Sequence, residues 1–290
     1  IVTFLTLHHF TNPGWLADLG GWANSKTVFY FTRFAKKVFD YCAQLVDFWI
    51  SFNEPQIYAS QAFWAGRWPP QEKSISKTAR VIFNIISAHK KVYKVLHQEN
   101  NRAKVGITLN LSCFEPLNKN SFLDRLTAAW QDFFRNHLFL RQIKNRLDFI
   151  GLNYYFRNLV QFPCKIVHKN KVVSDLGWEI YPRGIYKVLK KLKSYNLPIY
   201  ITENGLADSK DKLRANFIRD HLFWLWQALQ EGVDVRGYFH WSLLDNFEWD
   251  KGLSPRFGLV EVDYGDFKRT IRKSALFYAK VAKENKLVLL

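Results

Sequence analysis

The sequence predicts an α/β fold, a (β/α)8 TIM barrel of which about six of the eight βα units are present in this chain. Six short apolar runs read as strands, a helical pattern follows each, and most of the strands end in polar or aromatic residues. Strict alternation implies a parallel sheet with right-handed crossovers. Chemistry-bearing residues at many strand ends favour a barrel over a doubly wound sheet, and the sequence contains no G-x-G-x-x-G or P-loop motif.

The length fits one large domain. Over 290 residues, six units average about 48 residues each, so a full barrel needs on the order of 100 further residues before Ile1. Hydrophobic residues make up 48% and charged residues 23%, which is a composition that supports a sizeable core. We therefore expect residues 1–290 to form a single catalytic TIM-barrel domain that is incomplete at its N-terminus.

The elements follow from hydrophobic period and turn residues. Strands are expected to begin near residues 2, 48, 105, 148, 199 and 236, and helices to cover about 25–41, 76–98, 122–143, 182–195, 211–231 and 271–284. Ser25 is expected to cap the first helix, in which Phe29, Phe34, Val38 and Tyr41 recur at helical spacing. Segment 156–178 has no such period and is expected to be a long loop or a hairpin.

The charge balance bears on partners. Lys and Arg number 42 against 25 Asp and Glu, a formal net charge of +17. A nucleic-acid partner would make DNA retention sensitive to salt. The basic residues, however, occur as scattered pairs on expected helices and form no dense run, so we interpret them as solvated helix faces and expect no nucleic-acid partner.

Cysteine use and hydropathy bear on the compartment. Cys42, Cys113 and Cys164 are an odd number of cysteines at wide spacing, which suggests free thiols in a reducing, cytoplasmic compartment. No run approaches 18 uncharged apolar residues and no signal peptide is visible, so no membrane partner is expected. The oligomeric state stays open, and an oligomer is compatible with the sequence.

Two carboxylates stand at expected strand ends. Glu203 follows the apolar run 199–202 and precedes Asn-Gly, and Glu54 follows the run 48–52 within Asn-Glu-Pro. Taken alone, Glu203 is as well explained by a structural ion pair. Two carboxylates facing each other across a barrel mouth, about 5 Å apart, suit glycoside hydrolysis with an acid and a nucleophile. No metal site is expected, because adjacent residues His8 and His9 point to opposite faces of a strand.

Aromatic and polar residues near the strand ends fit a sugar ligand. Trp178, Trp241 and Trp249 offer flat walls for a sugar ring. Side chains able to hydrogen-bond hydroxyl groups are supplied by His9, Asn53, Asn153 and Glu248. On composition alone Trp241 fits the core equally well, and Glu248 could belong to a loop salt bridge.

Five stretches are spread in order over essentially the whole chain: Thr6–Phe10, Ser51–Pro55, Gly151–Tyr155, Tyr200–Gly205 and Trp241–Trp249. With these stretches the sequence resembles family 1 of the glycoside hydrolases, the β-glucosidase and β-galactosidase family. The resemblance implies that Glu54 is the acid/base, that Glu203 is the nucleophile and that no cofactor is needed. It also implies that the Glu248-Trp249 pair selects unphosphorylated sugars.

The resemblance assigns roles to the remaining site residues. Asn53 would hold the sugar 2-hydroxyl, Tyr155 would hydrogen-bond the nucleophile, and Trp178 would wall the aglycone side. His9 and Glu248 would contact the glycone hydroxyls, and Trp241 and Trp249 would line that subsite. The expected substrate is a small β-glycoside or oligosaccharide.

The sequence departs from the family pattern at its start. The first two βα units are absent, together with a strand-1 Gln that binds the glycone and a strand-2 Arg beside the nucleophile, and Phe10 stands where many members have Trp. This chain by itself is therefore expected to be a poor catalyst or none, unless a second chain or further residues complete it. The alternative hypothesis is a catalytically impaired or non-catalytic truncated barrel that binds sugars or a partner.

Overall fold

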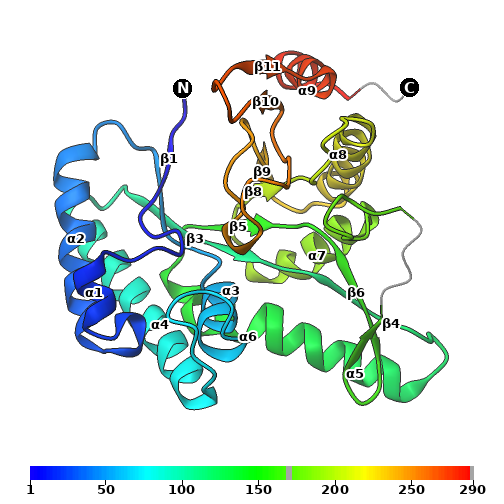
Figure 1. Cartoon of the computed structure of the whole chain (residues 1–290). Helices are drawn as coiled ribbons and strands as arrows, with labels where there is room; N and C mark the ends of the chain where they lie inside the picture. The colour runs from blue at the N-terminus through cyan, green and yellow to red at the C-terminus, as the bar shows by residue number, and fades with distance from the viewer. Residues whose placement is uncertain (168–171, 288–290) are drawn as a thin grey trace. The chain divides into compact units, whose positions relative to one another are not determined.

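The computed structural model of the chain describes residues 1–167 and 172–287 (Figure 1). All six predicted strands are present and form one sheet in the order β1-β2-β3-β5-β8-β9. Their bounds are β1 (Phe4–Thr6), β2 (Phe48–Asn53), β3 (Lys104–Asn110), β5 (Phe149–Asn153), β8 (Ile199–Asn204) and β9 (Val235–His240). The sheet order follows the chain order, as expected for successive βα units.

The sheet is parallel where its register is defined. β1 pairs with β2 and β2 with β3 in parallel, with Phe4 opposite Phe48 and Phe48 opposite Lys104. Between β5 and β8, the N–H of Ile150 donates to the Pro198 carbonyl at 2.9 Å, and the N–H of Tyr154 donates to the Glu203 carbonyl at 3.0 Å. In a parallel sheet the carboxyl ends of neighbouring strands lie at the same edge.

Helices separate the strands as predicted. Their bounds are α1 (Gly14–Asp18), α2 (Lys26–Cys42), α3 (Pro55–Ala59), α4 (Ile75–Glu99), α5 (Phe122–Asp132), α6 (Leu138–Ile143), α7 (Arg183–Leu192), α8 (Arg214–Gln230) and α9 (Lys273–Glu284). Short 3-10 turns are η1 (Gly21–Ala23), η4 (Lys144–Arg146), η5 (Lys193–Tyr195) and η6 (Trp249–Lys251), and π-helical turns are η2 (Ser60–Trp64) and η3 (Phe133–His137). The expected helix 122–143 is thus divided by one π-turn.

The cap of α2 differs from the prediction, and the side chains that the helix buries are not those whose spacing predicted it. Ser25 has helical backbone angles and makes no capping hydrogen bond; instead the Asn24 side chain accepts from the N–H of Lys26 at 2.9 Å. The buried residues of this helix are Thr27, Val28, Phe31, Ala35 and Phe39. Phe29, Phe34 and Tyr41, three of the four residues whose spacing predicted the helix, are exposed. Helical spacing alone therefore did not identify the face that packs.

Segment 156–178 forms a hairpin over its described part. β6 (Arg157–Gln161) and β7 (Lys165–Val167) pair antiparallel, and β4 (Cys113–Pro116) joins β6 in parallel to make a three-stranded sheet. The part of the predicted loop at residues 168–171 lies outside the described residues. A second hairpin near the C-terminus pairs β10 (Val260–Val262) with β11 (Arg269–Ile271).

Contacts group the chain into two compact units. The first comprises residues 1–110, 134–152 and 197–199, and the second comprises 111–133, 153–196 and 200–290. The boundary passes through β5 and β8 rather than through a linker, and the single catalytic domain stays a prediction. Among the described residues, none of the helices has the length and apolar character that crossing a bilayer requires.

Gly106 on β3 tests the packing of the first unit. A Cβ at this position would lie 2.6 Å from the ring of Phe149, so Gly106→Ala forces that buried ring to move. We expect a loss of about 1–3 kcal/mol in the free energy of unfolding, measured by urea denaturation. Gly14→Ala is the matched control, because a Cβ there meets no atom within 4 Å. An equal effect of the two substitutions would contradict this account.

Candidate active site

Glu54 lies just past the end of β2. Its N–H donates to the Thr108 carbonyl at 2.8 Å, which extends the β2–β3 ladder to this residue. Its backbone is left-handed, with φ of 45°, a conformation that costs free energy for a residue with a Cβ and is concentrated at functional sites. The Asn110 amide donates to Glu54 Oε1 at 3.1 Å. The buried carboxyl is thereby oriented by a neighbouring strand.

His9 and Asn53 lie together in the same unit as Glu54. The Asn53 amide nitrogen donates to His9 Nε2 at 3.0 Å, which requires that this ring nitrogen carry no proton. Burial lowers the pKa of His9 to about 4, so the ring is neutral near pH 7. His8 points elsewhere and packs against aromatic rings, with Trp22 donating to it at 3.1 Å. Only one of the two adjacent histidines therefore accompanies Glu54.

Glu203 and Tyr155 are joined in the second unit. The Tyr155 hydroxyl donates to Glu203 Oε2 at 2.6 Å, and both side chains are buried. A hydrogen bond this short to a carboxylate is of the strong, charge-assisted kind. Because β5 leads directly into Tyr155 and β8 carries Glu203, the ladder between these strands sets the contact.

Amides around Glu203 are held by a connected set of hydrogen bonds. Thr202 Oγ1 donates to the side-chain oxygen of Asn153 at 2.7 Å. The Asn204 amide donates to the Tyr154 carbonyl at 2.6 Å and accepts from the Tyr238 hydroxyl at 2.9 Å. Both asparagines are fully buried, so satisfying their polar atoms avoids a desolvation penalty.

Gly205 allows the chain to approach Trp241 closely. The Trp241 N–H donates to the Asn204 carbonyl at 3.0 Å, and the Trp241–Ser242 peptide bond is cis. A Cβ on Gly205 would overlap the Trp241 carbonyl oxygen. Glycine is therefore required at this position by the space available, which explains the Asn-Gly step after the strand.

Trp178 and Trp241 pack on one aromatic cluster. The cluster contains the buried residues Tyr155, Ala207 and Phe257, and both tryptophans, each partly exposed, lie against it. The Trp178 ring centroid is 5.6 Å from that of Tyr155, with the planes at 66°. Trp241 is thus neither plain core nor free surface, and the two indole rings border the residue that contacts Glu203.

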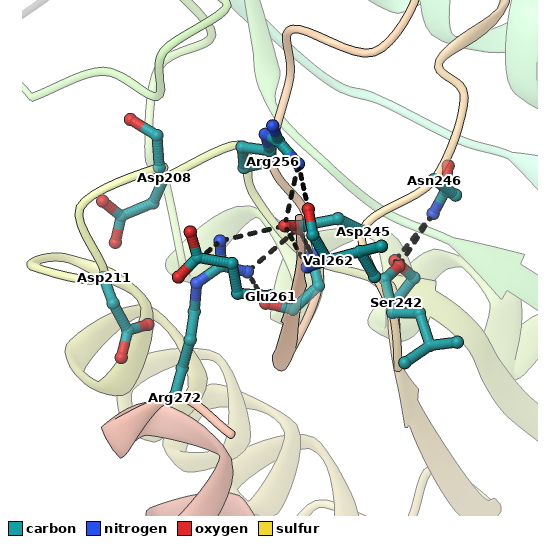
Figure 2. Close-up of polar contacts among 12 residues, drawn as sticks. Asp208, Asp211, Ser242, Asp245, Asn246, Arg256, Glu261, Val262 and Arg272 are labelled. Atoms are coloured by element: carbon teal, nitrogen blue, oxygen red, sulfur yellow. Dashed lines mark hydrogen bonds and ion pairs between the residues drawn. The ribbon is translucent and has the colours of Figure 1, made fainter. Parts of the chain in front are cut away.

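Asp245 anchors the loop that follows β9 (Figure 2). Its fully buried carboxylate makes two ion-pair hydrogen bonds to Arg272, at 2.9 and 3.0 Å, and accepts the Gly258 N–H at 2.8 Å. Arg256 approaches the same carboxylate at 3.4 Å. These partners hold the pKa of Asp245 below its usual value although burial opposes this. The ion pair connects the loop to residues 256–272.

Glu248 and Trp249 end this loop. Burial, and then the negative charge of Asp250, raise the pKa of Glu248 to about 7. Both effects disfavour the charged form, whereas the cation of a loop salt bridge would lower the pKa. Trp249 has a left-handed backbone with φ of 45° and is partly exposed. Both side chains are held by the loop that Asp245 anchors.

Each predicted site residue therefore lies in one of two sets. His9, Asn53 and Glu54 belong to the first unit, and the second unit holds Asn153, Tyr155, Trp178, Glu203, Trp241, Glu248 and Trp249. Sequence reasoning missed Asn110, which contacts Glu54, and the Asp245–Arg272 pair. Asn110 ends a strand, and this position could have marked it as a site residue. Asp245 and Arg272 lie 27 positions apart, and no sequence pattern indicates that they pair. Among residues 1–167 and 172–287, no group of three or more His, Cys, Asp or Glu side chains could hold a metal ion.

Comparison with known proteins identifies the family of the chain. The family model "Glycosyl hydrolase family 1" matches residues 1–143 and 139–287. Beta-glucosidase A of Thermotoga maritima is 35% identical over 99% of this chain and 74% of its own length. The chain therefore belongs to glycosyl hydrolase family 1, and its fold is a partial (β/α)8 barrel.

Two further relatives bear on the function. The solved structure of the beta-glucosidase from Thermotoga maritima in complex with glucoimidazole has a TM-score of 0.94 and 35% identity, covering 99% of this chain and 75% of that one. The galactolipid galactosyltransferase SFR2, chloroplastic, of Arabidopsis thaliana is 34% identical over 98% of this chain and 48% of its own length. The family thus contains proteins named for hydrolysis and for transfer.

Substitution of Asp245 tests the loop anchor. Asp245→Ala removes the two short ion-pair contacts of the buried Arg272 cation and leaves it only one ion-pair partner, the exposed carboxylate of Glu261 at 3.9 Å, so we expect the free energy of unfolding to fall by about 3–5 kcal/mol. The matched control is Asp234→Ala, which breaks a two-contact ion pair with Arg236 that is half exposed to solvent. That change is expected to cost less than about 1 kcal/mol. Equal losses in urea denaturation would show that the Asp245 pair adds no more than a surface pair.

Proposed function

We propose that this protein is a retaining β-glycosidase that hydrolyses unphosphorylated β-glucosides or β-galactosides by double displacement. The observation that carries the proposal is the 2.6 Å hydrogen bond from Tyr155 to the buried carboxylate of Glu203 at the end of β8, in a member of this family. A carboxylate held in one orientation at a strand end is suited to attack a carbon centre rather than to support the fold.

Glu203 and Glu54 share the reaction. An oxygen of Glu203 forms a bond to the anomeric carbon while the bond to the leaving oxygen breaks, and Glu54 gives that oxygen its proton. Glu54, now ionised, takes a proton from water as the water oxygen displaces Glu203 from the anomeric carbon. Both carboxyl groups return to their starting states, and the anomeric configuration is retained.

The surrounding side chains would bind the sugar. Asn53 would hold the 2-hydroxyl, and its amide is hydrogen-bonded to the neutral ring of His9. Trp178 would wall the aglycone side, and the residues that would line or contact the glycone are His9, Asn153, Trp241, Glu248 and Trp249. The T. maritima relative that binds glucoimidazole supports a glucose-sized ligand for this arrangement.

A second candidate is glycosyl transfer. The relative named as a galactolipid galactosyltransferase aligns with 98% of this chain, so an acceptor other than water deserves a test. The chemistry to the covalent intermediate is the same, and only the second step differs, because an acceptor hydroxyl replaces water. Product analysis distinguishes the two: hydrolysis releases free sugar, whereas transfer yields a new glycoside.

Glu203→Ala tests the proposed nucleophile. With a chromogenic β-glucoside, we expect kcat to fall by at least about 10³-fold, since the covalent intermediate no longer forms. Glu231→Ala is the control, because that surface glutamate pairs with Lys190 and lies outside the proposed site. Undiminished activity in Glu203→Ala would refute the assignment. Sugar binding by the unaltered protein without turnover would instead favour the non-catalytic sugar-binding barrel.

Glu248 predicts a pH dependence of sugar binding. Because its pKa is raised to about 7, the carboxyl is protonated below that pH and ionised above it. A carboxylate accepts stronger hydrogen bonds from hydroxyl groups, so affinity for a non-hydrolysable β-thioglucoside should rise with pH and level off above the pKa. Below it, affinity should fall by at most about tenfold per pH unit in calorimetric titrations. Glu248→Gln should bind more weakly and without this slope; the same slope in both proteins would contradict the role.

A further inference from the structure

Helix α5 buries its polar face and exposes its apolar face. Its buried residues are Asp124, Thr127, Ala128, Gln131 and Asp132, which are polar or small. Its large apolar residues point to solvent: Phe122 is 66% exposed, Leu126 57% and Trp130 51%. These three recur every four residues and so share one face of the helix. An amphipathic helix normally buries that face.

Specific contacts hold α5 in this orientation. The Asp124 carboxylate accepts the N–H of Phe162 at 3.0 Å and the N–H of Asn118 at 3.1 Å. Asp132 forms an ion pair with Lys191 at 2.8 Å. Ala128 packs with Phe114 and Val160 of β4 and β6, the strands that lie beside α5 in Figure 1. Rotating the helix to bury its apolar face would break these contacts.

The surface around the start of α5 is basic. Lys119, Arg125 and Lys165 are exposed. Arg125 follows Asp124 directly, and the other two lie within three residues of Asn118 and Phe162, whose N–H groups donate to Asp124. Segments 117–130 and 161–167 contain one acidic residue, Asp124, whose carboxylate is buried. Phe162, at the turn between β6 and β7, adds an exposed aromatic ring.

We propose that this surface, formed by α5 and the β6–β7 turn, docks the protein reversibly on an anionic lipid bilayer. The rings of Phe122, Trp130 and Phe162 suit the boundary between headgroups and acyl chains, where aromatic residues with apolar bodies are stable. The three exposed cations match negatively charged headgroups, and the +17 charge of the whole chain adds long-range attraction.

Charge selects this occupant over a second copy of the chain. Two copies meeting through this surface would bring the same cations, and two charges of +17, toward each other without an exposed acid from these segments to offset them. A bilayer with anionic lipid supplies both the apolar layer and the negative charge. No step of this inference uses the glycosidase chemistry, so either proposal can fail alone.

Vesicle binding tests the proposal. We expect the protein to co-sediment with vesicles of mixed phosphatidylcholine and phosphatidylglycerol, and more weakly with pure phosphatidylcholine. Phe122→Ser combined with Leu126→Gln should lower the partition coefficient by about tenfold or more. The matched control is Phe83→Ser with Leu276→Gln, which changes equally exposed residues on α4 and α9 and should leave binding unchanged.

A second pair of variants tests the cations. Lys119→Gln with Lys165→Gln keeps the apolar face, and each change should reduce binding to the anionic vesicles by about fivefold. Lys90→Gln with Lys94→Gln on α4 is the control and should have a smaller effect. The proposal is wrong if neither vesicle binds, if both bind equally, or if control and test variants behave alike. It is also wrong if sedimentation shows that wild type dimerises and Phe122→Ser with Leu126→Gln does not.

Discussion

The main-chain ladder between β5 and β8 sets the geometry on which the rest of the second unit depends. Through the bond from the Tyr154 N–H to the Glu203 carbonyl at 3.0 Å, it places the side chain of Tyr155 beside the carboxylate that it contacts. Asn153 lies beside Thr202 for the same reason. Because these side chains follow from main-chain register, a slip by one residue would turn each of them to the opposite face of the sheet.

The strands could be predicted because each is a local apolar run with a polar end, and both signals lie within a few residues. The contact between Tyr155 and Glu203 was predicted from the family resemblance and not from the residues alone. Asp245 and Arg272 could not be paired from sequence, since no periodicity relates positions 27 apart and loop residues do not reveal burial. The cap at Ser25 was wrong because Ser25 already has helical backbone angles, and the Asn24 side chain accepts the N–H of Lys26 instead.

Helix α5 shows where hydrophobic period misleads. Its spacing correctly predicts a helix, but period gives the existence of an apolar face and not its direction. Hydrogen bonds to Asp124 and the small contact at Ala128 decide the direction, and both depend on segments distant in sequence. The expectation of no membrane partner rests on the lack of a long apolar run, a criterion that detects spanning segments and is blind to a helix lying on a surface.

The Asp245 anchor also bears on how the protein can be altered. The arginine that neutralises this carboxylate lies at position 272, immediately before α9, so the loop carrying Glu248 and Trp249 draws its rigidity from the last stretch of the chain. Tags or reporter domains are best joined beyond α9, whereas a deletion reaching back to Arg272 would release a strand-end loop far earlier in the sequence. The segment at Arg272 is therefore structurally part of the loop that carries Glu248 and Trp249.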